Sequence, residues 1–119
     1  MKSEGFRRIA LSMPGAVEGS HMGHADFRVG GVKGKIFATL PKPDEEVGMV
    51  KLSLEDQDRF VEAHPGVFVG AAGAWGRAGC TYVQLRDVRA AVVRKAMQAA
   101  WRKAAPEGLA GKARPGKGT

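Results

Sequence analysis

The amino-acid sequence predicts an α+β domain, in which an antiparallel sheet of about five strands carries helices on one face. Three observations support this prediction. Apolar residues recur at helical spacing near both ends of the chain, they alternate with polar residues through the middle, and clusters of Gly and Pro separate the alternating runs. The expected order of elements is α-β-β-β-β-α-β-β-α.

The first helix is predicted over residues 2–13. Phe6 and Ile9 lie on one helical face, and Ser3 is a suitable N-cap. Pro14 ends the pattern, because proline cannot continue a helix. We therefore expect a short amphipathic helix at the start of the chain.

Three strands follow, because the spacing of apolar residues changes to every second position. Gly30, Gly31 and Gly34 mark the first turn, and the Pro-rich acidic segment 41–46 marks the second. A further edge strand, with a weaker pattern, is expected at residues 20–24. The apolar residues of the three strands are Phe27, Val29, Ile36, Ala38, Leu40, Val50 and Leu52.

The second half of the chain begins with a capping box formed by Ser53 and Asp56, which predicts a helix ending at His64. The elements after it are a short strand over 67–69, a Gly- and Ala-rich loop over 70–79, a strand over 80–86 and a helix capped by Asp87. One side of this last helix is apolar, with Val88, Val92, Val93, Ala96, Met97, Ala100 and Trp101, and the other carries Arg94, Lys95, Gln98 and Arg102.

Length and composition are those of one globular domain, with 119 residues of which 44% are hydrophobic. From residue 106 the sequence is rich in Gly, Lys and Arg, so we expect one domain over 1–105 and a flexible basic tail over 106–119. No run approaches the roughly 18 apolar residues of a membrane span, and the first residues lack the apolar core of a signal peptide. Cys80 is the only cysteine, which excludes an internal disulfide and favours the cytoplasm.

The charge balance indicates an anionic partner. The chain has a formal net charge of +7, and nucleic acid is the commonest polyanion in a cytosol. The alternative is that the charge serves solubility alone.

Strand parity places basic and aromatic side chains together on the face opposite the predicted core. That face receives Arg28, Lys35, Phe37, Thr39, Met49, Lys51, Tyr82, Gln84 and Arg86. Cations neutralise phosphates and flat rings stack on bases, so this mixture indicates a nucleic-acid-binding surface. The alternative is that the loop over 70–79 covers Phe37, Met49 and Tyr82 and leaves the cations at the fringe.

Trp75, Gly76 and Arg77 lie within that loop, where the glycines permit close approach of the backbone to the sheet or to a ligand. We expect Trp75 to be buried as a structural anchor against the sheet. Arg77 is expected to reach a phosphate.

No pattern indicates catalysis, a metal site or a cofactor. His21 and His24 would point to opposite faces of one strand, and no cysteine or paired carboxylate completes a ligand set. Cys80 lacks a catalytic partner and fits as a small packed residue. The glycines at 30–34 lie between strands rather than before a helix, so they do not form a nucleotide phosphate loop.

Six segments, PGAVEGSHMGHADFRVGG, KIFATL, VKLSLEDQ, AHPGVF, AWGRAGCT and AWRKAAP, occur in an order that resembles the bacterial MmcQ/YjbR family between about Ile9 and Pro106. The resemblance implies a CyaY/frataxin-like fold and, through likeness to a phage double-wing domain, DNA binding. By position it highlights His24, Arg28, Lys35, Trp75, Gly76 and Arg77. It does not imply frataxin-like iron binding, because Glu4 is accompanied by Arg7 and Arg8 in place of an acidic ridge.

We therefore expect a monomeric, non-catalytic protein that binds nucleic acid, and DNA is the expected kind. The expected contacts are Arg28, Lys35, Lys51, Arg77 and Arg86, with Phe37 and Tyr82 adding apolar contact. The alternatives are a protein or peptide interaction module on the same face, and a small-ligand site beneath the 70–79 loop around His24 and Trp75. Salt dependence would separate nucleic-acid binding from the interaction module.

Overall fold

A six-stranded antiparallel sheet with the strand order β1-β2-β3-β4-β6-β5 organises the computed structural model, which describes residues 1–31 and 33–108. The elements are α1 (Ser3–Leu11), β1 (Ala16–His21), β2 (His24–Val29), β3 (Lys35–Lys42), the 3₁₀ helix η1 (Pro43–Glu45), β4 (Val47–Lys51), α2 (Leu54–Ala63), β5 (Phe68–Gly70), α3 (Gly73–Arg77), β6 (Cys80–Gln84) and α4 (Ala90–Ala104). This arrangement confirms the predicted α+β class.

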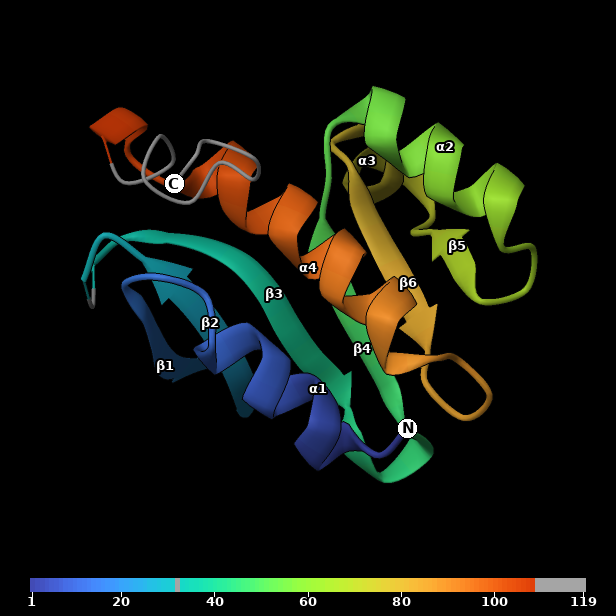
Figure 1. Ribbon diagram of the computed structural model, residues 1–119, viewed down its shortest axis with the longest axis horizontal. Coiled ribbons are helices and arrows are strands. Elements are labelled where there is room, and N and C mark those ends of the chain that lie inside the picture. Colours follow the sequence, from blue (N-terminus) through green and yellow to red (C-terminus); the bar gives the residue numbers. More distant parts are fainter. Residues whose placement is uncertain (32, 109–119) are drawn as a thin grey trace.

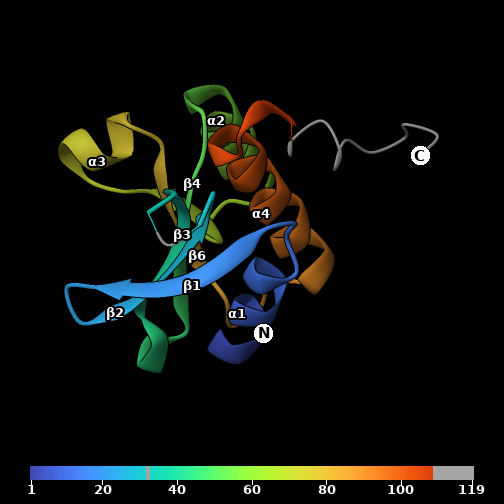
Figure 2. The same ribbon diagram turned by 90° about the vertical axis from the view of Figure 1, so that its left-hand side faces the viewer.

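The two faces of the sheet are covered differently. Helices α1 and α4 lie across one face, and α2 lies beside β5 at the edge (Figure 1). The β1–β2 hairpin and α3 project on the opposite side (Figure 2). We call this second side the open face.

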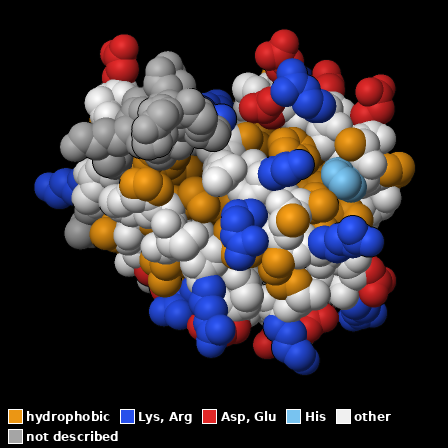
Figure 3. Space-filling view, viewed as in Figure 1, with side chains coloured by type: hydrophobic (Ala, Val, Ile, Leu, Met, Phe, Trp, Pro, Cys, Tyr) orange, Lys and Arg blue, Asp and Glu red, His pale blue; other side chains and the backbone are white. Residues whose placement is uncertain are grey.

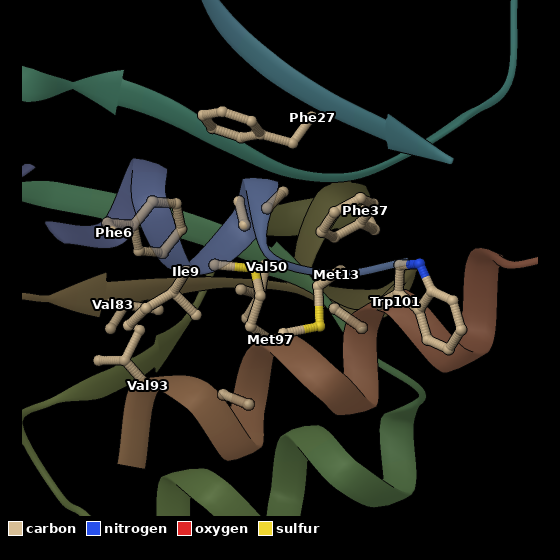
Figure 4. Packing of buried hydrophobic residues seen from close by; sticks show 14 of the residues in the cluster. Phe6, Ile9, Met13, Phe27, Phe37, Val50, Val83, Val93, Met97 and Trp101 are labelled. Atoms are coloured by element: carbon tan, nitrogen blue, oxygen red, sulfur yellow. The ribbon is translucent and has the colours of Figure 1, made fainter. Parts of the chain in front are cut away.

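The hydrophobic core lies between the sheet and helices α1 and α4 (Figure 4). Helix α1 contributes Phe6 and Ile9, the turn after it contributes Met13, and α4 contributes Met97 and Trp101. The indole Nε1 of Trp101 donates to the carbonyl of Pro14 at 2.8 Å, so the most polar atom of this buried ring is satisfied. The predicted core residues that are buried are Phe27, Val29, Ala38, Leu40, Val50, Leu52, Val83 and Leu85.

The predicted position of Phe37 on the open face is wrong. Phe37 is fully buried and lies in the core with Met13 and Trp101 (Figure 4). The reason is a β-bulge in β3. Phe27 pairs with Ala38, whereas its neighbour Arg28 pairs with Ile36, so Phe37 is an extra residue without a partner in β2.

The same bulge reverses the parity of the residues before it. Lys35 pairs with Val29, whose side chain is in the core, so Lys35 lies on the helix side instead of the open face. Ile36 pairs with Arg28 and is only half-buried, although alternation predicted it in the core. A single inserted residue therefore moves the predicted cation at the start of β3 to the other face.

Three further boundaries differ from the prediction. The edge strand is β1 at Ala16–His21 instead of residues 20–24. The predicted loop contains α3, and α4 begins at Ala90 with Arg89 as its N-cap, not at Asp87. The Ser53 cap is confirmed, because its hydroxyl accepts from the amide of Asp56 at 3.0 Å.

In the part of the chain that the structure describes, no helix combines the length and apolar character needed to cross a bilayer. The basic tail expected over 106–119 lies, from residue 109 onward, outside the described residues.

Candidate nucleic-acid interface

Cations from several elements meet at one end of the sheet. Lys35 is the first residue of β3 and Lys51 the last of β4, and because these strands are antiparallel the two residues belong to the same end. Lys103, in the last turn of α4, reaches this end as well, since its Nζ donates to the carbonyl of Leu52 at 3.2 Å. All three lysines line one hollow of about 400 Å³.

The hollow combines these cations with an apolar floor. Its other lining residues are Gly34, Ile36, Ala100 and Ala104, so none of the described residues that line it carries a carboxylate. Within the described chain, Lys35 and Lys51 form no ion pair. Their charges are therefore not neutralised locally.

Arg77 lies at the same end by topology. Helix α3 joins β5 to β6, and Cys80, the first residue of β6, pairs with Lys51. Arg77 is exposed and lines a second hollow with Leu54 and Gln57 of α2. We call Lys35, Lys51, Arg77 and Lys103 the basic end.

Helix α4 extends this positive surface over the helix side of the molecule. Arg94, Lys95 and Arg102 are exposed, and the helix contains no Asp or Glu. Arg94 and Arg102 are two turns apart, about 12 Å along the helix axis. Figure 3 shows Lys and Arg side chains across this face, whereas Asp and Glu lie around its margins, including the edge formed by α2.

Arg28 does lie on the open face, but its guanidinium is bound to Asp26. Nε donates to Oδ1 at 2.7 Å and a terminal nitrogen donates to Oδ2 at 2.9 Å. Asp26 is fully buried, and Arg28 is only 20% exposed. Asp26 pairs with Gly19 of the neighbouring strand β1. Because Gly19 has no side chain, it leaves room for the Asp26–Arg28 pair; a Cβ at this position would lie 2.9 Å from Oδ1 of Asp26.

A partly exposed histidine completes the cluster around the buried Asp26. The Nδ1 of His21 lies 2.6 Å from Oδ2 of Asp26. The pKa of Asp26 is lowered mainly by the hydrogen bonds from Arg28, with a smaller contribution from His21. These interactions together outweigh the effect of burial, which raises the pKa of a carboxyl group. The cluster is therefore an internally neutralised structural element of the open face.

The prediction that His21 and His24 point to opposite faces is wrong. The turn of the β1–β2 hairpin falls between them, so they pair directly across two strands and their rings lie 5.0 Å apart. Within residues 1–31 and 33–108, no group of three His, Cys, Asp or Glu side chains is arranged to hold a metal ion. Cys80 is buried, as expected for a small packed residue.

The remaining predicted contacts do not gather with the basic end. Arg86 lies beyond the opposite end of β6, where its Nε is 3.8 Å from a carboxylate oxygen of Glu46. Tyr82 is half-buried and pairs with Met49 across the open face. Phe37, being buried, is not available to a ligand.

The predicted burial of Trp75 is also wrong, since its side chain is 69% exposed. The buried residue of α3 is Gly76, where a Cβ would lie 1.8 Å from the carbonyl oxygen of Ala71. Adjacent helical residues point about 100° apart, so Trp75 is directed away from the surface that Gly76 packs against.

The sequence prediction missed Lys103 and treated Arg94, Lys95 and Arg102 as an ordinary solvated helix side. One signal was present, because residues 90–104 contain four cations and no acid. The convergence of Lys35, Lys51 and Lys103 had no local signal, since they are brought together by strand register and helix packing.

Comparisons with known proteins agree with this architecture. The family model described as YjbR matches residues 11–103. A crystal structure of the Deinococcus radiodurans protein DR2400, which has a DUF419 domain, superimposes with a TM-score of 0.72 at 16% sequence identity and covers 86% of this chain and 77% of that one. Among curated proteins no significant match is found. Since the match to the family model spans most of the 119 residues, the chain belongs to the YjbR family.

Proposed function

We propose that this protein binds nucleic acid by its sugar-phosphate backbone, at the basic end and along the outer side of α4. The observation that carries the proposal is the convergence of Lys35, Lys51 and Lys103 on one hollow without a carboxylate. Ammonium groups are the usual partners of phosphate oxygens, and neutralising several of them releases counterions from the nucleic acid.

The arrangement is unfavourable without an anion. Three like charges around one hollow repel each other, and no acidic side chain of the described chain offsets this by an ion pair with Lys35 or Lys51. A phosphate placed among them removes the repulsion. Repulsion of this kind favours an anionic ligand over an apolar peptide.

A polymeric anion accounts for more of the surface than a small one. The cations continue from the hollow to Arg102 and Arg94 on α4, and to Arg77 on α3. A single phosphate compound cannot span these positions, whereas a chain of phosphates contacts several of them at once. Nucleic acid is the polyanion of this kind that a cell contains in abundance.

The test is a titration of labelled oligonucleotides of about 20 nucleotides, single-stranded and duplex, at low and at moderate salt. The wild-type chain should bind both at low salt, with an affinity that falls steeply as salt rises. Replacing Lys35 and Lys51 together by Gln should weaken binding roughly tenfold and lower the salt slope by about 2.

A charge-matched control is available away from the basic end. Lys42 and Arg59 are exposed but have carboxylates nearby, Asp44 and Glu45 around the first and Asp56 at 3.4 Å from the second. Their double replacement by Gln removes the same charge and should change the affinity less than about twofold. Absence of binding at low salt, or equal losses in both double variants, would contradict the proposal.

A further inference from the structure

The two tryptophans of the chain have opposite environments. Trp101 is 2% exposed and its Nε1 is hydrogen-bonded to Pro14. The side chain of Trp75 is 69% exposed, and its indole makes no hydrogen bond or ring contact with another residue in the described part of the chain. Trp75 therefore does not contribute to the core, and an exposed aromatic ring of this size is typical of a binding surface.

The backbone that carries Trp75 is held on both sides. Gly76 packs directly against the carbonyl of Ala71, a position that no larger residue fits. The side-chain amide of Gln57 donates within 3.1 Å to the carbonyl of Gly76 and to the hydroxyl of Thr81, and within 3.2 Å to the carbonyl of Cys80. The indole is thus presented from a fixed segment, which lowers the entropy lost when a ligand orders it.

The surroundings of Trp75 leave the ring accessible. Its sequence neighbours in and after α3 are small, namely Gly73, Ala74, Gly76 and Ala78. Arg77 follows two positions later, and Lys51 lies opposite Cys80 at the same end of the sheet. A flat apolar ring and two cations therefore occur together at the basic end.

We propose that Trp75 stacks on an unpaired base, so that the preferred ligand is single-stranded nucleic acid. This inference rests on the proposed function. In a single strand the faces of the bases are accessible, and stacking on an aromatic ring adds affinity without base preference while cations contact the phosphates. In a duplex the bases already stack on each other, so the indole gains no such contact.

The experiment compares Trp75→Ala, Trp75→Leu and Trp75→Phe on an oligothymidine strand and on a duplex of the same length. Because the side chain is exposed, we expect all three variants to fold. The Ala and Leu variants should bind the single strand about tenfold more weakly, and the Phe variant should stay within about threefold of wild type. Duplex affinity should change less than about twofold in each.

Intrinsic fluorescence gives a second readout. Oligothymidine should quench the emission of the wild-type protein, because a base stacks on the exposed indole, and the quenching should disappear in Trp75→Ala, which retains only the buried Trp101. Retention of single-strand affinity by Trp75→Leu, or an equal loss for both ligands in Trp75→Ala, overturns the inference.

The inference and the proposed function fail differently. If the Lys35 and Lys51 variant weakens binding to both ligands while no Trp75 variant does, stacking is rejected and backbone binding stands. If the wild-type protein binds neither ligand at low salt, the proposed function itself is rejected, and the stacking inference with it.

Discussion

The open face and the basic end both carry the cations expected from the sequence, but they use them in different ways. On the open face, Arg28 is bound through two nitrogens to the buried Asp26. At the basic end, Lys35 and Lys51 have no acidic partner among the described residues. The cation of the open face is neutralised within the fold, whereas the two lysines of the basic end remain available to a ligand.

Whether a cation is available to a ligand depends on its nearest anion as well as on the face to which its strand directs it. Arg28 and Lys35 both belong to the β2–β3 hairpin and were both expected on one surface. A buried carboxylate at position 26 binds the first, and the bulge at Phe37 turns the second toward α4. The candidate site consequently lies at the end of the sheet and not on its open face.

The largest expected effect is a loss of stability on substitution of Phe37, the extra residue of the bulge in β3. Phe37→Ala should lower the free energy of unfolding by about 3 to 5 kcal/mol, because it removes a fully buried ring and leaves a cavity. Denaturant unfolding measures this loss. A loss below about 1 kcal/mol, the size expected for a surface position, would restore the predicted place of Phe37 on the open face.

The next effect concerns the neutralised cluster. Asp26→Asn should lower the free energy of unfolding by roughly 2 to 4 kcal/mol at about pH 7, because charge-assisted hydrogen bonds to Arg28 are lost. The exposed Asp58→Asn in α2 is the matched control and should change it by less than about 0.5 kcal/mol.

Acid should weaken the same cluster. The pKa of Asp26 is lowered in the folded state below its usual value of 3.8, so the stability from its ionised form is complete above that value. It is lost as the pH falls through the lower folded pKa. Unfolding measured between about pH 5 and pH 2 should therefore lose less stability in Asp26→Asn than in wild type, and parallel losses would argue against this assignment.

The smallest effect concerns binding. Arg28→Gln should change nucleic-acid affinity less than about twofold, since the guanidinium is bound to Asp26, whereas Arg102→Gln on α4 removes an exposed charge and should weaken binding about threefold. The same anisotropy titration serves both. If Arg28→Gln lowered the nucleic-acid affinity more than Arg102→Gln does, the interface would lie on the open face and not along α4.

Much of the fold was predictable because local patterns agree with it. The period of Phe6 and Ile9, the Ser53 cap and the turn glycines each specify a local structure that the tertiary fold retains. The short helix α3 was missed, since a run of Gly and Ala with one Trp has no amphipathic pattern. The exposure of Trp75 was missed for the same reason.

The sequence by itself determined the α+β class, most of the core and the excess of cations, because these follow from periodicity and composition. Only the tertiary structure decided which cations are available. A bulge changes side-chain direction by one residue, and a buried carboxylate neutralises a neighbour. The bulge depends on the register between β2 and β3. Asp26 and Arg28 are two residues apart in one strand, but the room for their buried pair depends on Gly19 of the neighbouring strand. The meeting of Lys35, Lys51 and Lys103 is likewise a product of register and helix packing.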